Sequence, residues 1–369
     1  MNGTLKLGKI AGIEVKIHPT FFFLILWVVL SALWSGATAA GVITEVGYVA
    51  VLFLCVVLHE LGHALVARRY GIQTQDILLL PIGGIARVEK MPEKPKEELL
   101  VALAGPAVNG LISVFIFLGL ILTGFFSAPQ SLTVALDSFW FQILAANVML
   151  ALFNLLPAFP MDGGRVLRAL LSTHMDTVEA TQTAATVGKV LAIILAFVGF
   201  FLNPWLILTA LIIWSGANSE AQTVQLKANL KGLIVRDATI RQFYQVEANQ
   251  TLESVFDLSL RTGQQTIPVI SNSRYLGFIQ RPNLLESMER LGRRAPAYAA
   301  IDLKPEGLSP DLPLVEALPK FTHTPVLPVV QDEAMFGIIT PESIQQVMWL
   351  NQHQSKAGAQ PPEEYIHTP

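Results

Sequence analysis

Three polar residues stand near the end of an apolar run in the segment VVLHELGHALVARRYGI, residues 56–72. His59 and His63 are four residues apart, so on a helix both imidazoles share one face and can reach the same metal ion. Glu60 follows the first histidine, where its carboxylate can contact a water molecule at the metal and act as general base. The spacing therefore predicts a zinc site for hydrolysis, with His59 and His63 as ligands and Glu60 as catalytic residue.

The pattern requires a third ligand elsewhere, because a catalytic zinc ion takes three protein ligands and keeps a fourth position open. Asp162, in NLLPAFPMDGGRVL, is the best candidate, since it follows a later apolar segment that ends on the same side. The surrounding prolines and glycines break the helix and allow the carboxylate to be aimed. The alternative is that Asp162 only caps a helix that begins near Gly163. Glu45 and Asp137 are also ionisable, but the loop charges place them on the opposite side.

The surrounding chain has the composition of an integral membrane protein. Of its 369 residues, 52% are hydrophobic and only 14% are charged, whereas soluble domains have about 25% charged residues. Long charge-free runs predict membrane helices, and we place about six at residues 17–37, 44–67, 99–124, 138–157, 185–202 and 204–219. A chance motif on an ordinary helix is the alternative, but polar groups at membrane depth are costly without a role.

The loop charges orient these helices. Lys and Arg occur before the first predicted helix, at both ends of the loop between the second and third, and after the fourth and sixth. The loops on the opposite side contain no Lys or Arg. The positive-inside rule then places both termini and the C-terminal domain in the cytoplasm. A bacterial plasma membrane is the expected location. A fully buried soluble core is the alternative, which the number of long charge-free runs disfavours.

Charge and cysteine content restrict the partners. The formal net charge is −3, so nothing favours a nucleic-acid partner, which would need a clustered basic face. Cys55 is the sole cysteine, so the chain cannot form an internal disulfide, and we expect the soluble part to face a reducing compartment.

The chain changes character near residue 223, where charged residues return. The segment QQTIPVISNSRYLGFIQRPNLLES is followed by a similar one, THTPVLPVVQDEAMFGIITPESIQQ, and each has the pattern of strand, turn, strand and helix. Such repeats bury a shared face. We therefore predict a polytopic α-helical membrane domain over residues 1–222, a soluble α+β domain of paired repeats over 223–350, and a disordered tail over 351–369.

The motifs together resemble the site-two proteases, the zinc metalloproteases of peptidase family M50 that cut within membranes. The resemblance covers about residues 1–220 and rests on HELGH at 59–63, GPAVN at 105–109, and the later motif with Asn154, Pro157, Asp162 and Gly163. Met161 stands where the family usually has Leu. The resemblance implies that His59, His63 and Asp162 bind one zinc ion, that Glu60 is the base, and that the substrate is a transmembrane segment of another protein in regulated intramembrane proteolysis.

The C-terminal repeats resemble a pair of CBS modules at about residues 233–350. CBS pairs often bind adenine nucleotides, with a Thr or Ser and an Asp holding the ribose. The second repeat has Thr340 but carries Ser343 at the Asp position, and the first repeat, with Gln280 and Asn283, lacks both. Ser cannot fully replace an Asp that receives two ribose hydroxyls, which disfavours nucleotide binding. The resemblance otherwise implies a regulatory, partner-docking or homodimerising module.

Two further residues are candidate substrate contacts. An extended substrate pairs with a strand edge, and the segment DILLLPIGGIARVE, which contains Ile85, could supply one. Asn154, and less strongly Asn109 and Asn147, could donate to the substrate backbone or to the developing oxyanion. The alternative for each asparagine is a hydrogen bond between helices.

Two other functions remain as alternatives to proteolysis. A CBS-bearing transporter would show inward-facing charges or a repeated half-structure along its spans, and the sequence has neither. A membrane protein that binds partners without cutting them would not need Glu60, which is present together with all three expected ligands.

Overall fold

The computed structural model describes residues 4–81, 83–88, 92, 94–125, 138–322 and 324–357, so Asp137 lies outside the described residues. The chain divides into two compact units, Met1–Val224 and Gln225–Pro369.

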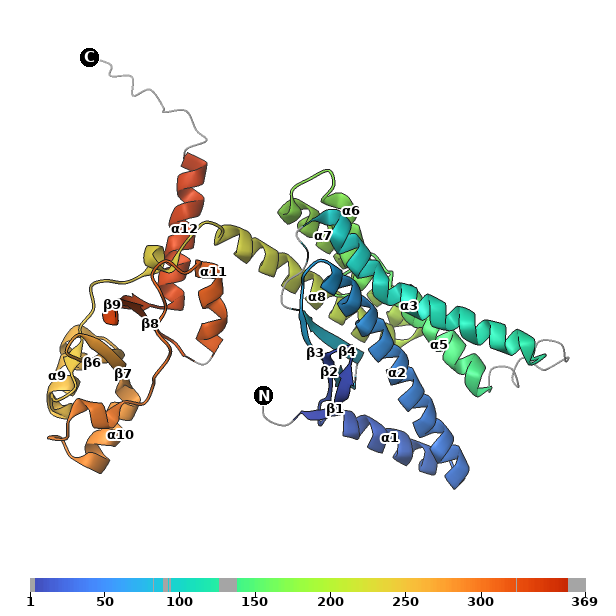
Figure 1. Cartoon of the computed structure of the whole chain (residues 1–369), viewed down its shortest axis with the longest axis horizontal. Coiled ribbons are helices and arrows are strands. Elements are labelled where there is room, and N and C mark those ends of the chain that lie inside the picture. Colours follow the sequence, from blue (N-terminus) through green and yellow to red (C-terminus); the bar gives the residue numbers. More distant parts are fainter. Residues whose placement is uncertain are drawn as a thin grey trace, which may run out of the picture. The chain divides into compact units, whose positions relative to one another are not determined.

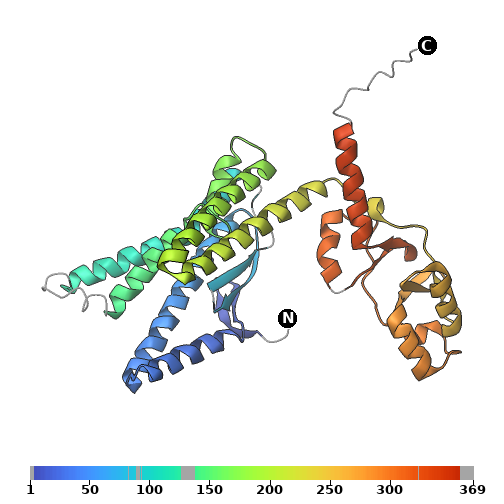
Figure 2. The ribbon, with the colours of Figure 1, turned by 180° about the vertical axis from the view of Figure 1, so that it is seen from behind.

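Seven helices in the described part of the chain build the first unit (Figure 1): α1 Phe21–Trp34, α2 Ala39–Arg69, α3 Pro95–Leu122, α5 Phe139–Asn154, α6 Asp162–Leu171, α7 Thr177–Leu202 and α8 Pro204–Asn229. The last of these continues unbroken past the boundary between the units at Gln225. Helix α3 runs beside α5 and crosses α2, and it contacts both (Figures 1 and 2).

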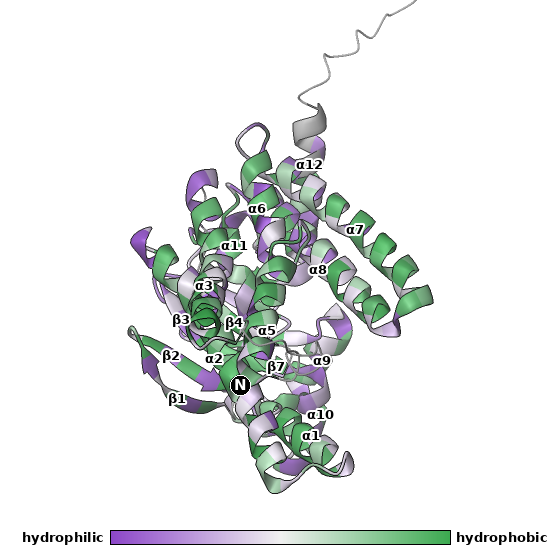
Figure 3. Ribbon diagram, turned by 90° about the vertical axis from the view of Figure 1, so that its right-hand side faces the viewer, coloured by the Kyte–Doolittle hydropathy of each residue, from purple (hydrophilic) through white to green (hydrophobic). Residues whose placement is uncertain are grey.

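Three of these helices, α2, α3 and α7, are long and apolar enough to cross a membrane, while α1 and α5 are shorter apolar helices. Figure 3 shows hydrophobic residues along α3 and α7. The prediction of six spans is therefore not established. The helical parts of the first and fourth predicted spans have only 14 and 16 residues, fewer than the ~20 that cross a bilayer upright, and α8 becomes polar after Trp214.

A four-stranded sheet packs against α2. Its strands β1 Leu5–Ile10, β2 Ile13–Ile17, β3 Thr74–Leu80 and β4 Gly83–Val88 pair in that order, with β2 and β3 parallel and the other pairs antiparallel. Alternate residues such as Val15, Ile77 and Leu79 are buried against Phe53 and Val57 of α2, which gives the sheet one apolar face, as the period of two requires. Within the described residues, β4 is an edge strand.

Small residues bring α3 close to α2. A Cβ atom on Gly62 would lie 2.9 Å from the carbonyl oxygen of Ala104 and 2.8 Å from a methyl group of Val108. Contacts this short leave room for no side chain at residue 62, so the glycine permits the helices to approach where the histidines lie.

The second unit contains a five-stranded sheet in the order β5-β6-β7-β9-β8. Its elements are 3-10 turns η1 Val235–Ala238, η2 Ala297–Ala300 and η3 Leu318–Thr322, strands β5 Val246–Glu247, β6 Thr266–Ser271, β7 Arg274–Gln280, β8 Leu327–Gln331 and β9 Ala334–Ile339, and helices α9 Leu252–Thr262, α10 Arg281–Leu291, α11 Leu314–Ala317 and α12 Pro341–Ala357.

The internal repeat appears in this sheet as two similar hairpins, β6–β7 and β8–β9, each followed by a helix. Both turns place two successive residues at positive φ, Asn272 with Ser273 and Asp332 with Glu333, which is the geometry of a type I′ hairpin turn. The structure extends α12 to Ala357, so residues 351–357 are helical where a disordered tail was predicted, and residues 358–369 lie outside the described residues.

Candidate metal centre

Helix α2 places both histidines of the motif in the interior. His59 and His63 are 4% and 9% exposed, and their Nε2 atoms lie 3.1 Å apart. The Nδ1 atom of His63 lies 2.7 Å from the Val101 carbonyl oxygen and donates to it, so the Nε2 atom is left without a proton and can bind a metal. The Nδ1 atom of His59 has no hydrogen-bond partner among the described residues.

Asp162 completes the group from a distant part of the sequence. Its Oδ2 atom lies 3.2 Å from His59 Nε2 and 3.0 Å from His63 Nε2. Asp162 is the first residue of α6, and the N-cap is Met161, so the side chain faces the histidines rather than capping the helix. A Cβ atom on Gly163 would lie 2.2 Å from the Leu156 carbonyl oxygen, and the glycine therefore allows the chain to turn tightly here.

The three side chains fit a zinc ion. Their ligand atoms all lie within 4.8 Å of one another, the one such group of His, Cys, Asp and Glu found in the described residues. Two imidazole nitrogens and a carboxylate oxygen are a donor set that zinc accepts. Gly105 of α3 faces them, where a Cβ atom would lie 2.2 Å from His63 Nε2 and 2.6 Å from His59 Nε2. The space beside both ligand nitrogens is therefore open only because residue 105 has no side chain.

The side chain of Glu60 extends from α2 to strand β4. Its Oε2 atom accepts a hydrogen bond of 3.2 Å from the backbone N–H of Ala86 in β4. A Cβ atom on Gly84 would lie 3.0 Å from Glu60 Cγ. The expected base is thus held by the edge strand, next to the histidine ligands.

The predicted asparagine contacts lie in different surroundings. Asn154 is partly buried and donates its amide to the Leu150 carbonyl oxygen one turn earlier on α5, at 3.0 Å. Asn109 and Asn147 are fully buried. Asn147 donates to Cys55 Sγ at 3.3 Å, while both amide atoms of Asn109 have no partner among the described residues. None of the three is placed against the metal group by a contact of this structure.

One residue near the site escaped prediction. Asp76 of β3 is 2% exposed and its carboxylate accepts from Lys16 of β2 at 2.5 Å and from Arg87 Nε of β4 at 2.5 Å. The hydrogen bonds from Arg87, followed by those from Lys16, hold the pKa of Asp76 below its usual range despite burial. The aspartate therefore ties β4 to the sheet beside Ala86, and an acidic residue next to the apolar run ILLL was the available signal.

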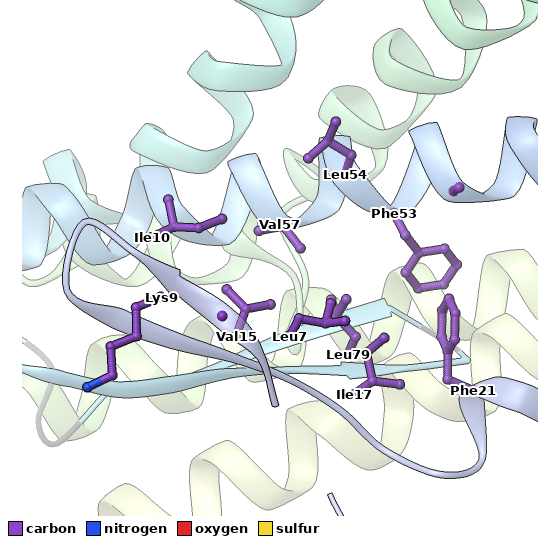
Figure 4. Close-up of a pocket in the computed structure, with 12 residues that line it drawn as sticks. Leu7, Lys9, Ile10, Val15, Ile17, Phe21, Phe53, Leu54, Val57 and Leu79 are labelled. Atoms are coloured by element: carbon purple, nitrogen blue, oxygen red, sulfur yellow. The ribbon is translucent and has the colours of Figure 1, made fainter. Parts of the chain in front are cut away.

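An apolar pocket of about 380 Å³ lies elsewhere in this unit, between the sheet, α1 and α2. Figure 4 shows Phe21, Phe53, Leu54 and Val57 on its wall, and of all its lining residues only Lys9 is ionisable. The pocket offers no set of groups for hydrolysis, in contrast to the group formed by His59, His63 and Asp162.

Comparison with known sequences relates the chain to zinc metalloproteases. The sequence model of peptidase family M50 matches residues 47–198. A zinc metalloprotease of Methanocaldococcus jannaschii is 32% identical over 349 residues, which cover 94% of this chain and 97% of that protein. The solved structure of a site-2 protease from the same organism is 36% identical and covers 59% of this chain and 95% of its own, with a TM-score of 0.43.

A partial likeness to another solved structure was also found. The crystal structure of a CBS domain-containing protein from Bacillus anthracis covers 34% of this chain and 98% of its own length, at 19% identity and a TM-score of 0.31.

Proposed function

The chain belongs to peptidase family M50 and is a zinc metalloprotease of the membrane, and from this premise we propose that it cuts a peptide bond within or near a transmembrane segment of another protein. The convergence of His59, His63 and Asp162 on one point carries the proposal. His59 and His63 come from a helix long and apolar enough to cross a membrane, which supports a substrate that is itself embedded in the bilayer.

We propose that His59, His63 and Asp162 hold the zinc ion. When bound, zinc polarises the scissile carbonyl and lowers the pKa of a water molecule. Glu60 then takes the proton from the attacking water and delivers it to the leaving nitrogen, which is the role of a general base and acid. Its hydrogen bond from Ala86 occupies Oε2 and fixes the carboxylate, so that the other oxygen is available for the proton.

The edge of β4 is the proposed binding surface for the substrate backbone. Ala86 turns its N–H toward Glu60 rather than toward β3. Because backbone groups alternate in direction along a strand, the N–H and carbonyl of Gly84 and the carbonyl of Ala86 then point to the edge where a substrate could pair. The side chain of Ile85 is 50% exposed and lies on the other face of the strand. A substrate that unwinds and pairs with this edge would lie beside Glu60.

The loop charges and the repeats suggest how the protein is organised in the cell. We propose a bacterial plasma membrane protein with cytoplasmic termini, because Lys and Arg gather in alternate loops. The second unit is proposed to be a CBS-like regulatory or homodimerising module, which its two matching hairpins support. Asn154 stays a proposed donor to the oxyanion, since its amide nitrogen carries two N–H groups and the bond to Leu150 uses one of them.

Replacing Glu60 with Gln tests this function. The purified full chain would be reconstituted in liposomes with a panel of single-pass transmembrane segments that carry a reporter. Loss of general base catalysis should lower cleavage by roughly 10²–10⁴-fold, while zinc content stays at the wild-type level. Undiminished cleavage by the Glu60→Gln protein would show that the activity comes from another site.

A further inference from the structure

A buried ion group joins three helices close to the third ligand. Arg168 of α6 is 5% exposed, and its Nε atom donates to Oε1 of Glu98 in α3 at 2.8 Å. A second guanidinium nitrogen donates to the same oxygen at 2.5 Å, and the third donates to Glu220 of α8. A planar guanidinium suits such a fork of bonds, which an ammonium group cannot reproduce. Helix α6, which begins with Asp162, is thus fastened to α3 on one side and to α8 on the other.

The same arginine also contacts the loop that leads to Asp162. Its guanidinium carbon lies 5.4 Å from the centre of the Phe159 ring, within the range of a cation–π interaction. Phe159 is 1% exposed and stands three residues before Asp162. Arg168 therefore holds both ends of the turn, the loop before the ligand and the helix after it.

Helix α8 touches this loop at a second point. A Cβ atom on Gly216 would lie 2.6 Å from Pro160 Cδ, so the helix backbone rests directly on the proline ring. Gly216 and Glu220 are four residues apart and share one face of α8. Helix α8 therefore contacts the residues before Asp162 through Gly216 and those after it through the Glu220–Arg168 pair.

We propose that Arg168 is a positioning residue for the metal ligand Asp162, and that α8 contributes to this positioning through Glu220. The carboxylate must point at two imidazole nitrogens that are fixed on another helix, so a small rotation of α6 would carry it away from them. Both helices that brace α6 are reached through Arg168. The inference rests on the zinc site proposed above.

The test measures zinc affinity by competition with a chelator, together with the absorption spectrum of the Co²⁺-substituted protein, for four variants of the detergent-purified full chain. Replacing a residue that orients a metal ligand from outside the coordination shell typically lowers metal affinity by about 10–100-fold. Arg168→Gln should lower the zinc affinity by an amount in this range, and Arg168→Lys by an amount near its lower end. Glu220→Gln should weaken zinc binding by about threefold, since Glu98 keeps Arg168 in place. All three should change the Co²⁺ spectrum, which reports on ligand geometry.

The matched control is Glu97→Gln, which removes the carboxylate next to Glu98 on the same helix. Glu97 pairs with Lys94 at the surface, where the lysine is 80% exposed, so zinc affinity and the Co²⁺ spectrum should stay at wild-type values. Circular dichroism and melting temperature show whether each variant is folded. Loss of Arg168 leaves Glu98 buried without its partner, so if Arg168→Gln does not fold, Arg168→Lys and Glu220→Gln carry the test.

The outcomes separate this inference from the proposed function. Affinities and spectra of folded Arg168→Lys and Glu220→Gln proteins that match the wild type would overturn the positioning role, even if the wild type binds zinc and cuts its substrate. A wild-type protein that binds no zinc would instead refute the metal site itself. A lower melting temperature of the Arg168 variants with unchanged zinc affinity would mean that Arg168 only stabilises the fold. That result would also contradict the inference.

Discussion

Polar side chains at the candidate metal centre and in the CBS-like unit have different kinds of partner. In the first unit, His59, His63 and Asp162 come from distant parts of the chain and point their ligand atoms at one another. In the second unit, the hydroxyl of Ser343 donates to the Thr340 carbonyl oxygen at 3.0 Å, and the Ser343 N–H donates to the Thr340 hydroxyl at 3.2 Å. Groups that satisfy one another locally cap a helix, whereas ligand atoms that converge from distant segments form a group that can hold a metal ion.

The first repeat of the second unit follows the same rule. Asn283 donates its amide to Asp302 at 2.5 Å, and Gln280 donates its backbone N–H to the same carboxylate. In both halves, a side chain at the positions that the sequence set beside the ribose-holding residues of CBS pairs is therefore bonded within the unit. Polar side chains thus converge from distant segments in the first unit and pair locally in the second.

The largest effect is expected when the space at the metal group is filled. Gly105→Ala would place a methyl carbon 2.2 Å from His63 Nε2, so the ligands must move, and we expect zinc content to fall below about a tenth of the wild-type value with cleavage lost. The control is Gly110→Ala on the same helix, where a Cβ atom meets nothing within 4 Å. Normal zinc content in Gly105→Ala would show that the ion does not lie at these nitrogens.

A smaller effect is expected at the edge strand. Ile85→Ala should lower kcat/KM by about tenfold, because the substrate loses an apolar contact comparable to a buried aliphatic side chain, while zinc content is unchanged. The matched control is Leu7→Ala on β1, at the opposite edge of the sheet, where the side chain is 62% exposed. Equal activity of the two variants would argue against β4 as the binding edge.

The buried aspartate of the sheet gives a pH-dependent effect. The pKa of Asp76 is lowered in the folded state, so its charge adds stability above the unfolded value of about 4, and this contribution is lost as pH falls through the folded pKa. Asp76→Asn should melt at a lower temperature than wild type at pH 7, and the difference should shrink as pH is lowered below about 4. A difference that stays constant from pH 7 to pH 3 would contradict the charge-based role.

The smallest effect is expected in the CBS-like unit. Equilibrium dialysis of the full chain against AMP or ATP should detect no binding near physiological concentration, since Thr340 and Ser343 bond to each other. A ligand at 100 times its Kd would stabilise the folded protein by about 2.7 kcal/mol, so the melting temperature gives a second measure. Saturable nucleotide binding would show that both regions hold ligands and would remove the contrast.

The metal group could be predicted from the sequence because its residues belong to short motifs with a recognisable spacing. Two histidines at helical spacing share a face, and Asp162 was recognisable as a carboxylate after an apolar segment. The membership of the chain in peptidase family M50 is confirmed by a family match and by a relative that spans nearly the whole chain. The roles of His59, Glu60, His63 and Asp162 stay predictions that the structure makes geometrically reasonable.

Long-range contacts are what the sequence left hidden. Arg168 looks like one more basic loop residue, and nothing local shows that it reaches Glu98, 70 positions away. Gly105 could not be assigned a purpose until α3 was seen to cross α2 at the histidines. The N-terminal strands β1 and β2 were also unforeseen, because the parallel pairing of β2 with β3 joins segments about 60 residues apart.

Zinc content per chain in detergent-purified wild-type and Asp162→Ala protein tests the central claim most directly. With a site formed by His59, His63 and Asp162, the wild type should hold about one zinc ion per chain, and the variant should lose it or bind it much more weakly. No zinc in well-folded wild-type protein, or the same affinity in both proteins, would contradict a metal centre built from these three side chains.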